Sequence, residues 1–159
     1  MKSILISIRP KWCEKIASGE ETIEVRKTRP KIDVPFKCYI YCTVNGITAK
    51  ERDANICTDY RGKVIGEFVC DYANPLRYPE DGLVDVVDVM QSCLSAPELI
   101  GYSNGKTLYG WNISDLVMYD KPKELTEFIR PPDNRKRAYC WDCEITRAPQ
   151  SWCYVEELA

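Results

Sequence analysis

The sequence contains no histidine among its 159 residues. This absence excludes Ser-His-Asp and Cys-His nucleophilic catalysis, and it excludes any metal site that uses imidazole ligands. The chain also has no apolar run long enough to span a bilayer, no low-complexity tract and no convincing internal repeat. Length and composition therefore predict one globular domain over residues 1–159, in which any active site would use Glu, Asp, Lys, Cys, Thr or Tyr.

The cysteine content and the start of the chain indicate the cellular environment. Nine cysteines are present. Because the number is odd and a chain of this size folds without disulfides, we expect reduced and buried thiols. The first residues, MKSILISIRPKW, alternate like a strand and lack the small-residue cleavage site of a signal peptide. We therefore expect a cytoplasmic protein that makes no contact with a membrane.

Charge is almost balanced over the whole chain, with a net charge of −2, but it is unevenly distributed. Residues 1–37 hold nine Lys and Arg against five Asp and Glu, a balance of +4, so the remaining residues carry −6. A basic N-terminal third is compatible with a phosphate-binding face, and a solvated strand and helix surface explains it about as well.

Residues 18–30, SGEETIEVRKTRP, form the stretch around which we expect the chain to be organised. Gly19 can end the preceding helix, because a left-handed backbone costs glycine nothing. In the strand that follows, side chains alternate, so Glu24 and Arg26 share one face. The pair is either a site for a polar ligand, with a guanidinium donor fork and a carboxylate acceptor or base, or a structural ion pair.

Alternating and amphipathic patterns predict several short strands and two helices. Strands are expected at residues 4–9, 22–27, 38–44, 63–71, 107–113, 116–120 and 151–158. One helix runs from Pro10 to about residue 18, and Ser95 with Glu98 starts another through a capping box. Gly66 and Gly110 mark bends or close approaches within strands. This pattern predicts an α+β fold, a small and mostly antiparallel β-barrel with flanking helices, and an α+β sandwich is the alternative.

Two cysteines have the spacing of half a zinc knuckle, Cys140 and Cys143. The thiolates that could complete such a site are Cys13, Cys38, Cys42 and Cys57. A single C-x-x-C pair is weak evidence for a metal, so the sequence predicts no cofactor. A structural zinc that fixes the loop at 130–149 and does no chemistry is the alternative.

The succession of a strand, a helix ending in Ser-Gly and the segment TIEVRK resembles the ASCH family, whose signature after the first helix is G-x-K-x-x-E-x-R. Gly19, Glu24 and Arg26 match this signature, whereas Glu21 stands where the family usually carries lysine. The segments ILISIRPKW, GWNISDLVMYDKP and RAPQSWCYVEEL resemble a phage and bacterial branch of the family, so the likeness spans nearly the whole chain. The resemblance implies a single ASCH domain with a PUA-like β-barrel and an RNA-recognising cleft beside the first helix and the signature strand.

Some small ASCH proteins hydrolyse the acetyl amide of N4-acetylcytidine, and their resemblance to this chain implies a lysine and a threonine in the same stretch. By alignment, the lysine falls on Glu21 and the threonine on Glu24. This departure counts against amidohydrolase chemistry here.

The leading hypothesis is a module that binds RNA, a nucleotide or a modified base in this cleft. Basic side chains would hold phosphates, Glu24 would accept a hydrogen bond from a base amine, and aromatic rings would stack on bases or pack in the core. The residues assigned to binding are Arg9, Lys11, Trp12, Glu24, Arg26, Lys27, Trp152 and Tyr154.

Two alternatives belong to other classes. The first is a metal-independent hydrolase acting on a nucleoside or RNA, in which Glu24 is the general base beside Arg26 or a catalytic Lys27. The second is a phage or bacterial interaction scaffold that contacts a protein partner through the loops at 45–61 and 130–149.

Overall fold

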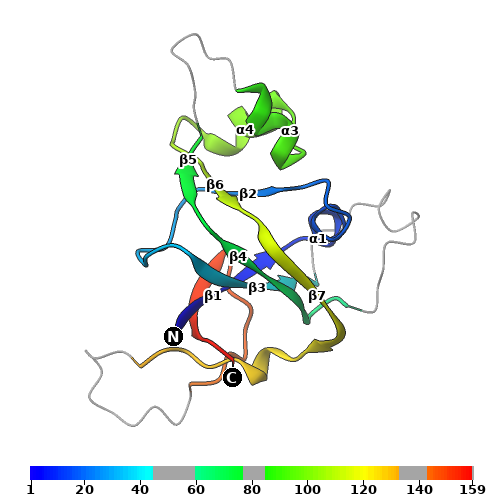
Figure 1. The fold of residues 1–159 in the computed structure, drawn as a ribbon, viewed down its shortest axis with the longest axis vertical. Helices are drawn as coiled ribbons and strands as arrows, with labels where there is room; N and C mark the ends of the chain where they lie inside the picture. Colours follow the sequence, from blue (N-terminus) through cyan, green and yellow to red (C-terminus); the bar gives the residue numbers. More distant parts are fainter. Residues whose placement is uncertain (45–59, 77–84, 133–142, 159) are drawn as a thin grey trace.

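The computed structural model describes residues 1–44, 60–76, 85–132 and 143–158 (Figure 1). The strands are β1 (Lys2–Ile8), β2 (Ile23–Arg26), β3 (Phe36–Cys42), β4 (Val64–Cys70), β5 (Ala73–Pro75), β6 (Tyr109–Asn112), β7 (Ser114–Lys123) and β8 (Trp152–Glu156). The helices are α1 (Pro10–Ala17), α3 (Val86–Ser92), α4 (Ala96–Ser103) and a short 3-10 helix, η1 (Leu125–Glu127).

The described strands form two sheets. One has the order β7-β4-β3-β1-β8 and the other the order β2-β6-β5. All pairings in these sheets are antiparallel except the one between β1 and β3. The expectation of an α+β fold with mostly antiparallel strands is therefore confirmed. The expectation of a barrel is corrected, because the described strands do not close into one.

The division into two sheets occurs where the chain passes from β6 into β7. β6 pairs with β2 and β5, whereas β7 pairs with β4. Between them, the Ile113 amide donates to the Thr22 carbonyl at 3.0 Å, and Ser114, the first residue of β7, already pairs with Val69 of β4. The chain therefore changes its pairing partner within a few residues, and hydrogen bonding among the described strands does not continue around a closed surface.

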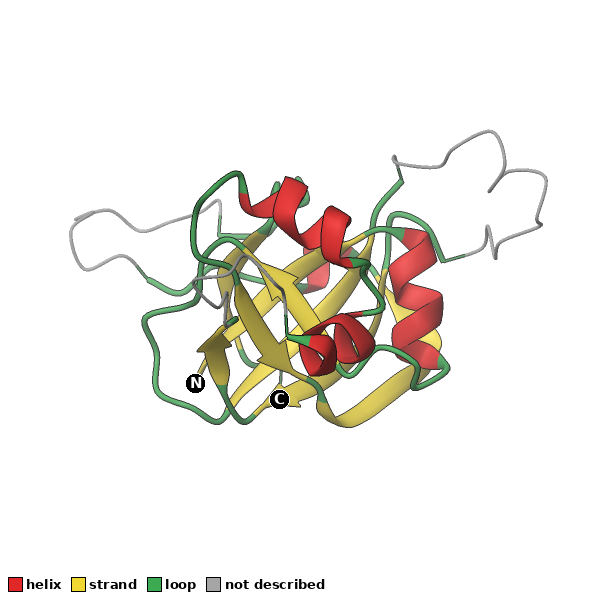
Figure 2. Ribbon diagram, turned by 90° about the horizontal axis from the view of Figure 1, so that it is seen from above, coloured by secondary structure: helices red, strands yellow, loops and turns green. Residues whose placement is uncertain are grey.

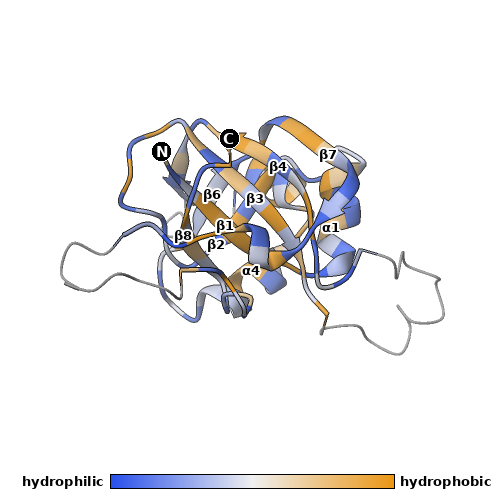
Figure 3. Cartoon of the chain, turned by 90° about the horizontal axis from the view of Figure 1, so that it is seen from below, coloured by the Kyte–Doolittle hydropathy of each residue, from blue (hydrophilic) through white to orange (hydrophobic). Residues whose placement is uncertain are grey.

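The inner strand β1 is buried on both faces. Ile4, Ile6 and Ile8 pack in one hydrophobic cluster with Trp111, while Leu5 packs in a second cluster with Phe128 and other residues. In β8, the faces divide as alternation predicts, with Trp152 and Tyr154 against the first cluster and Cys153 and Val155 in or against the second. Figure 3 shows hydrophobic residues concentrated in these central strands.

The helices begin and end at the residues that the sequence indicates. Pro10 opens α1, and Gly19 follows it with a φ of 78°. Ser95 and Glu98 form the predicted capping box of α4. Helix α3 was not predicted, and its first turn is capped by the Asp85 side chain. Figures 1 and 2 show α3 and α4 lying together beside the three-stranded sheet. None of the described helices has the length and apolar character needed to cross a membrane.

Gly66 lies where β4 pairs with β7. The close approach of another backbone, one of the two roles predicted for this glycine, is observed here. A Cβ atom at this position would come within 2.5 Å of the Val117 carbonyl oxygen. The register between β4 and β7 also shifts next to it. The edge strand β7 can therefore pair here only because residue 66 has no side chain.

Replacing Gly66 by alanine is expected to reduce the free energy of unfolding by about 2–4 kcal/mol, since the added methyl group would push β7 from its position. Gly101→Ala is the matched control. It lies inside α4 with nothing within 4 Å of its added Cβ, so a gain of about 0.5–1 kcal/mol is expected. Urea denaturation of both variants measures the difference, and equal stabilities would contradict the close approach.

Candidate functional site

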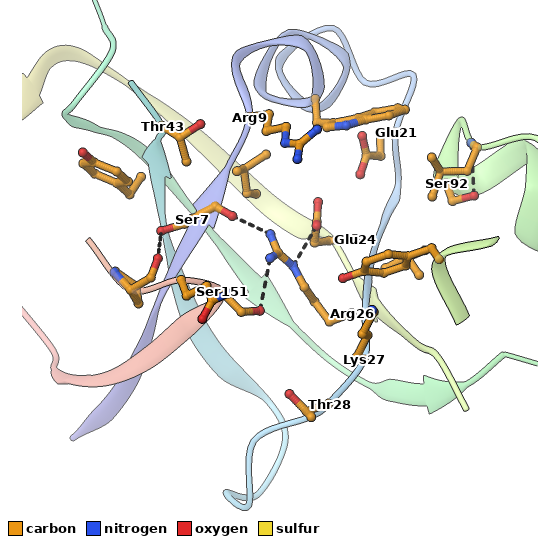
Figure 4. A pocket seen from close by; sticks show the side chains of 18 of the residues that line it. Ser7, Arg9, Glu21, Glu24, Arg26, Lys27, Thr28, Thr43, Ser92 and Ser151 are labelled. Carbon is orange, nitrogen blue, oxygen red and sulfur yellow. Dashed lines mark hydrogen bonds and ion pairs between the residues drawn. The ribbon is translucent and has the colours of Figure 1, made fainter. Parts of the chain in front are cut away.

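A cleft of about 1170 Å³ opens between the start of α1, strand β2, helix α4 and the segment before β8. Figure 4 shows its labelled side chains converging from these elements. The polar and charged side chains that line it are Ser7, Arg9, Glu21, Glu24, Arg26, Lys27, Thr28, Thr43, Ser92, Glu98, Gln150 and Ser151. Trp12, Tyr41 and Tyr102 are its aromatic lining residues.

Arg26 is fixed at the floor of the cleft by three protein groups. Its Nη2 donates to the Ser7 carbonyl oxygen at 2.6 Å, and its Nη1 donates to the Ser151 hydroxyl at 3.2 Å. Its Nε lies 2.9 Å from Glu24 Oε1, an ion pair that lacks the straight geometry of a hydrogen bond. Because only 8% of Arg26 and 7% of Glu24 is exposed, this guanidinium acts first as a cross-link between elements.

Glu21 lies beside this ion pair as a second buried carboxyl group. It is 4% exposed, and its Oε2 has no hydrogen-bond partner. Burial, the charge of Glu24 and a hydrogen bond with Glu24 raise the pKa of Glu21 to about 10. At neutral pH, therefore, the floor holds a neutral Glu21 carboxyl group next to the Glu24–Arg26 ion pair.

The mouth of the cleft carries exposed cations and aromatic rings. Arg9 precedes α1 and is exposed, and its side chain reaches the cleft. The Lys27 ammonium lies 4.7 Å from the centre of the Tyr102 ring on α4. Trp12 is half-buried and lines the cleft from α1. This arrangement offers positive charge and flat apolar surfaces at the entrance, above polar acceptors at the floor.

The structure brings together five of the eight residues assigned to binding from the sequence, namely Arg9, Trp12, Glu24, Arg26 and Lys27. The other three do not line the cleft. Lys11 lies on α1 with its ammonium 4.8 Å from the Trp12 ring centre. Trp152 donates through Nε1 to the Thr28 hydroxyl, and the Tyr154 hydroxyl accepts from the Lys31 amide. Both rings pack against the first hydrophobic cluster, as the core-packing alternative expects.

The structure describes four of the six cysteines named in the zinc hypothesis, Cys13, Cys38, Cys42 and Cys143. Cys140 and Cys57 lie outside the described residues. Cys143 is half-buried, and Cys13, Cys38 and Cys42 are buried free thiols. Across residues 1–44, 60–76, 85–132 and 143–158, no three Cys, Asp or Glu side chains gather in a way that could hold a metal ion.

Sequence patterns did not predict several of the residues that line the cleft. Tyr102 belongs to a helix whose cap was predictable, but its placement over β2 depends on tertiary packing. Ser7 and Ser151 contribute through a carbonyl and a hydroxyl group, which no motif identifies. In the sequence, Glu21 stood out only because it differs from the lysine of the ASCH signature that the chain resembles. The structure shows that this difference places a buried carboxyl group in the cleft.

The fold is ASCH-like, as comparison with solved structures shows. The chain is similar to an ASCH protein from Zymomonas mobilis, with a TM-score of 0.58 and 18% identity over 98% of this chain and 88% of that chain. Two mutant forms of that protein match with TM-scores of 0.61 and 17% identity, over 98–99% of this chain and 89–92% of theirs. No protein-family model and no curated protein matches the sequence. At this level of identity, the likeness establishes the fold.

Replacing Arg26 by methionine is expected to reduce the free energy of unfolding by about 3–5 kcal/mol, because Glu24 would remain as a buried carboxylate without its cation. Lys31→Met is the control, since Lys31 is exposed and should change stability by less than about 0.5 kcal/mol. Chemical denaturation at pH 7 compares the two variants. A small loss in the Arg26 variant would show that Arg26 does not hold the floor of the cleft.

Stability should depend on pH through Glu21. With its pKa raised from 4.5 to about 10, the folded protein keeps a proton that the unfolded chain releases, so stability falls as pH rises through this window. The Glu21→Gln variant lacks this dependence. Its free energy of unfolding should therefore rise relative to wild type between pH 5 and pH 9, by at most about 1.4 kcal/mol per pH unit.

Thermal and urea denaturation across this pH range test the expectation. Glu20→Gln is the control, because Glu20 is the exposed neighbour that pairs with Lys15. A constant difference between the Glu21→Gln variant and wild type at all pH values would mean that Glu21 is ionised throughout.

Proposed function

We propose that this protein binds RNA, or a nucleotide or modified base of the kind found in RNA, in the cleft between α1, β2 and α4. The observation that carries the proposal is the combination of exposed cations and aromatic rings at the mouth with buried hydrogen-bonding groups at the floor. Recognition of unstacked bases needs these same elements: charge for the phosphates, a flat surface for stacking and polar atoms for the base edge.

The cations at the mouth supply the phosphate contacts. Arg9 and Lys27 line the cleft and are exposed, and no salt bridge among the described residues involves either of them. Arg26, by contrast, uses its donors within the protein, so it orders the site and contributes less to phosphate binding. With a net charge of only −2, binding would depend on this local arrangement rather than on the field of the whole molecule.

The aromatic residues supply stacking surfaces. Trp12 and Tyr102 come from different helices and both line the cleft. Each ring already lies close to a lysine ammonium, that of Lys11 or Lys27. A stacked base would share the rings with these cations, which are then well placed to meet the phosphates on either side of it.

The test is RNA binding by variants that lack one charge at the mouth. Arg9→Gln and Lys27→Gln should each weaken binding of a single-stranded RNA hexamer, and each should reduce the slope of log K against log salt by about 0.7, the contribution of one phosphate contact. Lys121→Gln is the matched control, because Lys121 is exposed on β7 and does not line the cleft. Fluorescence anisotropy measures the dissociation constants between about 50 and 200 mM salt, where affinity for nucleic acid falls steeply with salt concentration.

Equal weakening by all three variants would point to non-specific attraction and contradict a site in the cleft. Absence of binding to RNA, nucleotides and nucleosides by the wild-type protein would overturn the proposed function.

A second candidate is a hydrolase that acts on a nucleoside or on RNA. The observation that favours it is the pair of adjacent carboxyl groups, one neutral and one ionised, which is the arrangement of a general acid and a general base. Product formation from RNA or from N4-acetylcytidine, followed by chromatography, would support it. Product that forms equally fast with Glu24→Gln would exclude Glu24 as the base.

A further inference from the structure

Glu21 Oε2 is a buried acceptor in the cleft without a donor. The side chain is 96% buried, and this oxygen has no hydrogen-bond partner. Burying such a group without a partner is unfavourable, and native structures seldom leave it unpaired unless a ligand or another group completes it. Because Glu21 lines the cleft, a bound ligand can supply the missing donor.

The donors nearest in the floor are committed elsewhere. Arg26 contacts Glu24, the Ser7 carbonyl and the Ser151 hydroxyl. The Ser7 hydroxyl donates to the Pro149 carbonyl at 2.6 Å. Figure 4 shows Glu21 and Glu24 facing the same space, with the guanidinium of Arg26 on the far side of Glu24. The two carboxyl groups thus form a wall that presents acceptor oxygens to the cleft.

We propose that Glu21 and Glu24 together accept the two hydrogens of an exocyclic amino group, so that the cleft selects nucleobases bearing an amine, such as cytosine or adenine, over uracil. This inference rests on the proposed function, since it names the class of base that enters the RNA-binding cleft. It assigns to Glu21, where the family signature has lysine, the role of reading the base.

The chemistry of the two carboxyl groups favours an amine over a carbonyl. A carboxylate has about four lone-pair positions, and the Arg26 ion pair uses only one side of Glu24. Glu21 Oε2 has no hydrogen-bond partner in the protein and can act as an acceptor. An amino group can donate one hydrogen to each side chain. Uracil has a carbonyl oxygen at the same place, and its lone pairs would face the carboxyl oxygens without a hydrogen between them.

The surroundings fit a flat ligand in this orientation. Trp12 on α1 and Tyr102 on α4 line the same cleft as the two glutamates. A base held between aromatic surfaces has its edge free to reach the floor, while the sugar and phosphate stay at the mouth near Arg9 and Lys27.

The test compares two hexamers, oligocytidylate and oligouridylate, whose bases differ at position 4 and in whether N3 carries a hydrogen. Cytosine carries an amine where uracil carries a carbonyl, and the rings are of equal size, so stacking contributes little to the difference. The wild-type protein should bind the cytosine hexamer at least tenfold more tightly than the uracil hexamer. Fluorescence anisotropy at fixed salt and pH 7 gives both dissociation constants.

Two variants of Glu21 and one control variant then test whether Glu21 is responsible for the preference for cytosine over uracil. Glu21→Met removes the acceptor with little change in volume, so the cytosine-to-uracil ratio should fall to within about twofold of one. Glu21→Gln keeps an oxygen acceptor and should retain most of the ratio. Glu20→Met makes the same substitution at the exposed neighbouring glutamate and should leave the ratio at the wild-type value.

The outcomes separate this inference from the function on which it rests. Binding of both hexamers with equal affinity by the wild-type protein would overturn the amine selectivity and leave RNA binding in place. A wild-type ratio in the Glu21→Met variant, or equally low ratios in both Glu21 variants, would also overturn it. No binding of either hexamer would count against the proposed function and this inference together.

Discussion

The Arg26 guanidinium is the contact on which the arrangement of this molecule depends. It lies on β2, in the three-stranded sheet, and bonds to the Ser7 carbonyl of β1 and to Ser151 just before β8, both in or beside the five-stranded sheet. Strand pairing does not join the two sheets in the described part of the chain. A planar side chain with several fixed donors therefore links them through largely buried polar contacts. The ion pair foreseen at residues 18–30 is therefore present, and both of its residues line the cleft that we propose as a ligand site.

The electrostatics of the cleft follow from the contacts that Arg26 makes within the protein. Since Arg26 neutralises Glu24, the second carboxyl group, Glu21, is left without a cation among the described residues and holds its proton. The floor is therefore close to neutral overall, while Arg9 and Lys27 make the entrance positive. Such a gradient attracts a polyanion to the mouth and disfavours entry of the phosphate itself. A nucleic acid would meet this surface with its backbone outside and one base inside.

Local features of the fold were predictable from the sequence, and features that depend on distant contacts were not. The capping box at Ser95 and the alternation in β8 involve residues a few positions apart, so the pattern contains the whole interaction. The described strands do not close into a barrel because β6 pairs with β2 and β5 whereas β7 pairs with β4, a change of partner that no pattern of hydrophobicity reveals. In the site, Glu24 and Arg26 were foreseen because they share a strand face. Tyr102 was not, because it reaches the cleft only when α4 packs beside β2.

The central position of β1 has a consequence for how the molecule opens. Ile6 faces one hydrophobic cluster and Leu5 the other, so a single strand belongs to both. Neither cluster can lose its packing while β1 stays in place, and β1 is held by hydrogen bonds to a parallel neighbour on one side and an antiparallel neighbour on the other. The two clusters should consequently melt as one cooperative unit, with the amides of β1 exchanging with solvent only through global unfolding. The strand that supplies Ser7 should then be a rigid reference for the cleft.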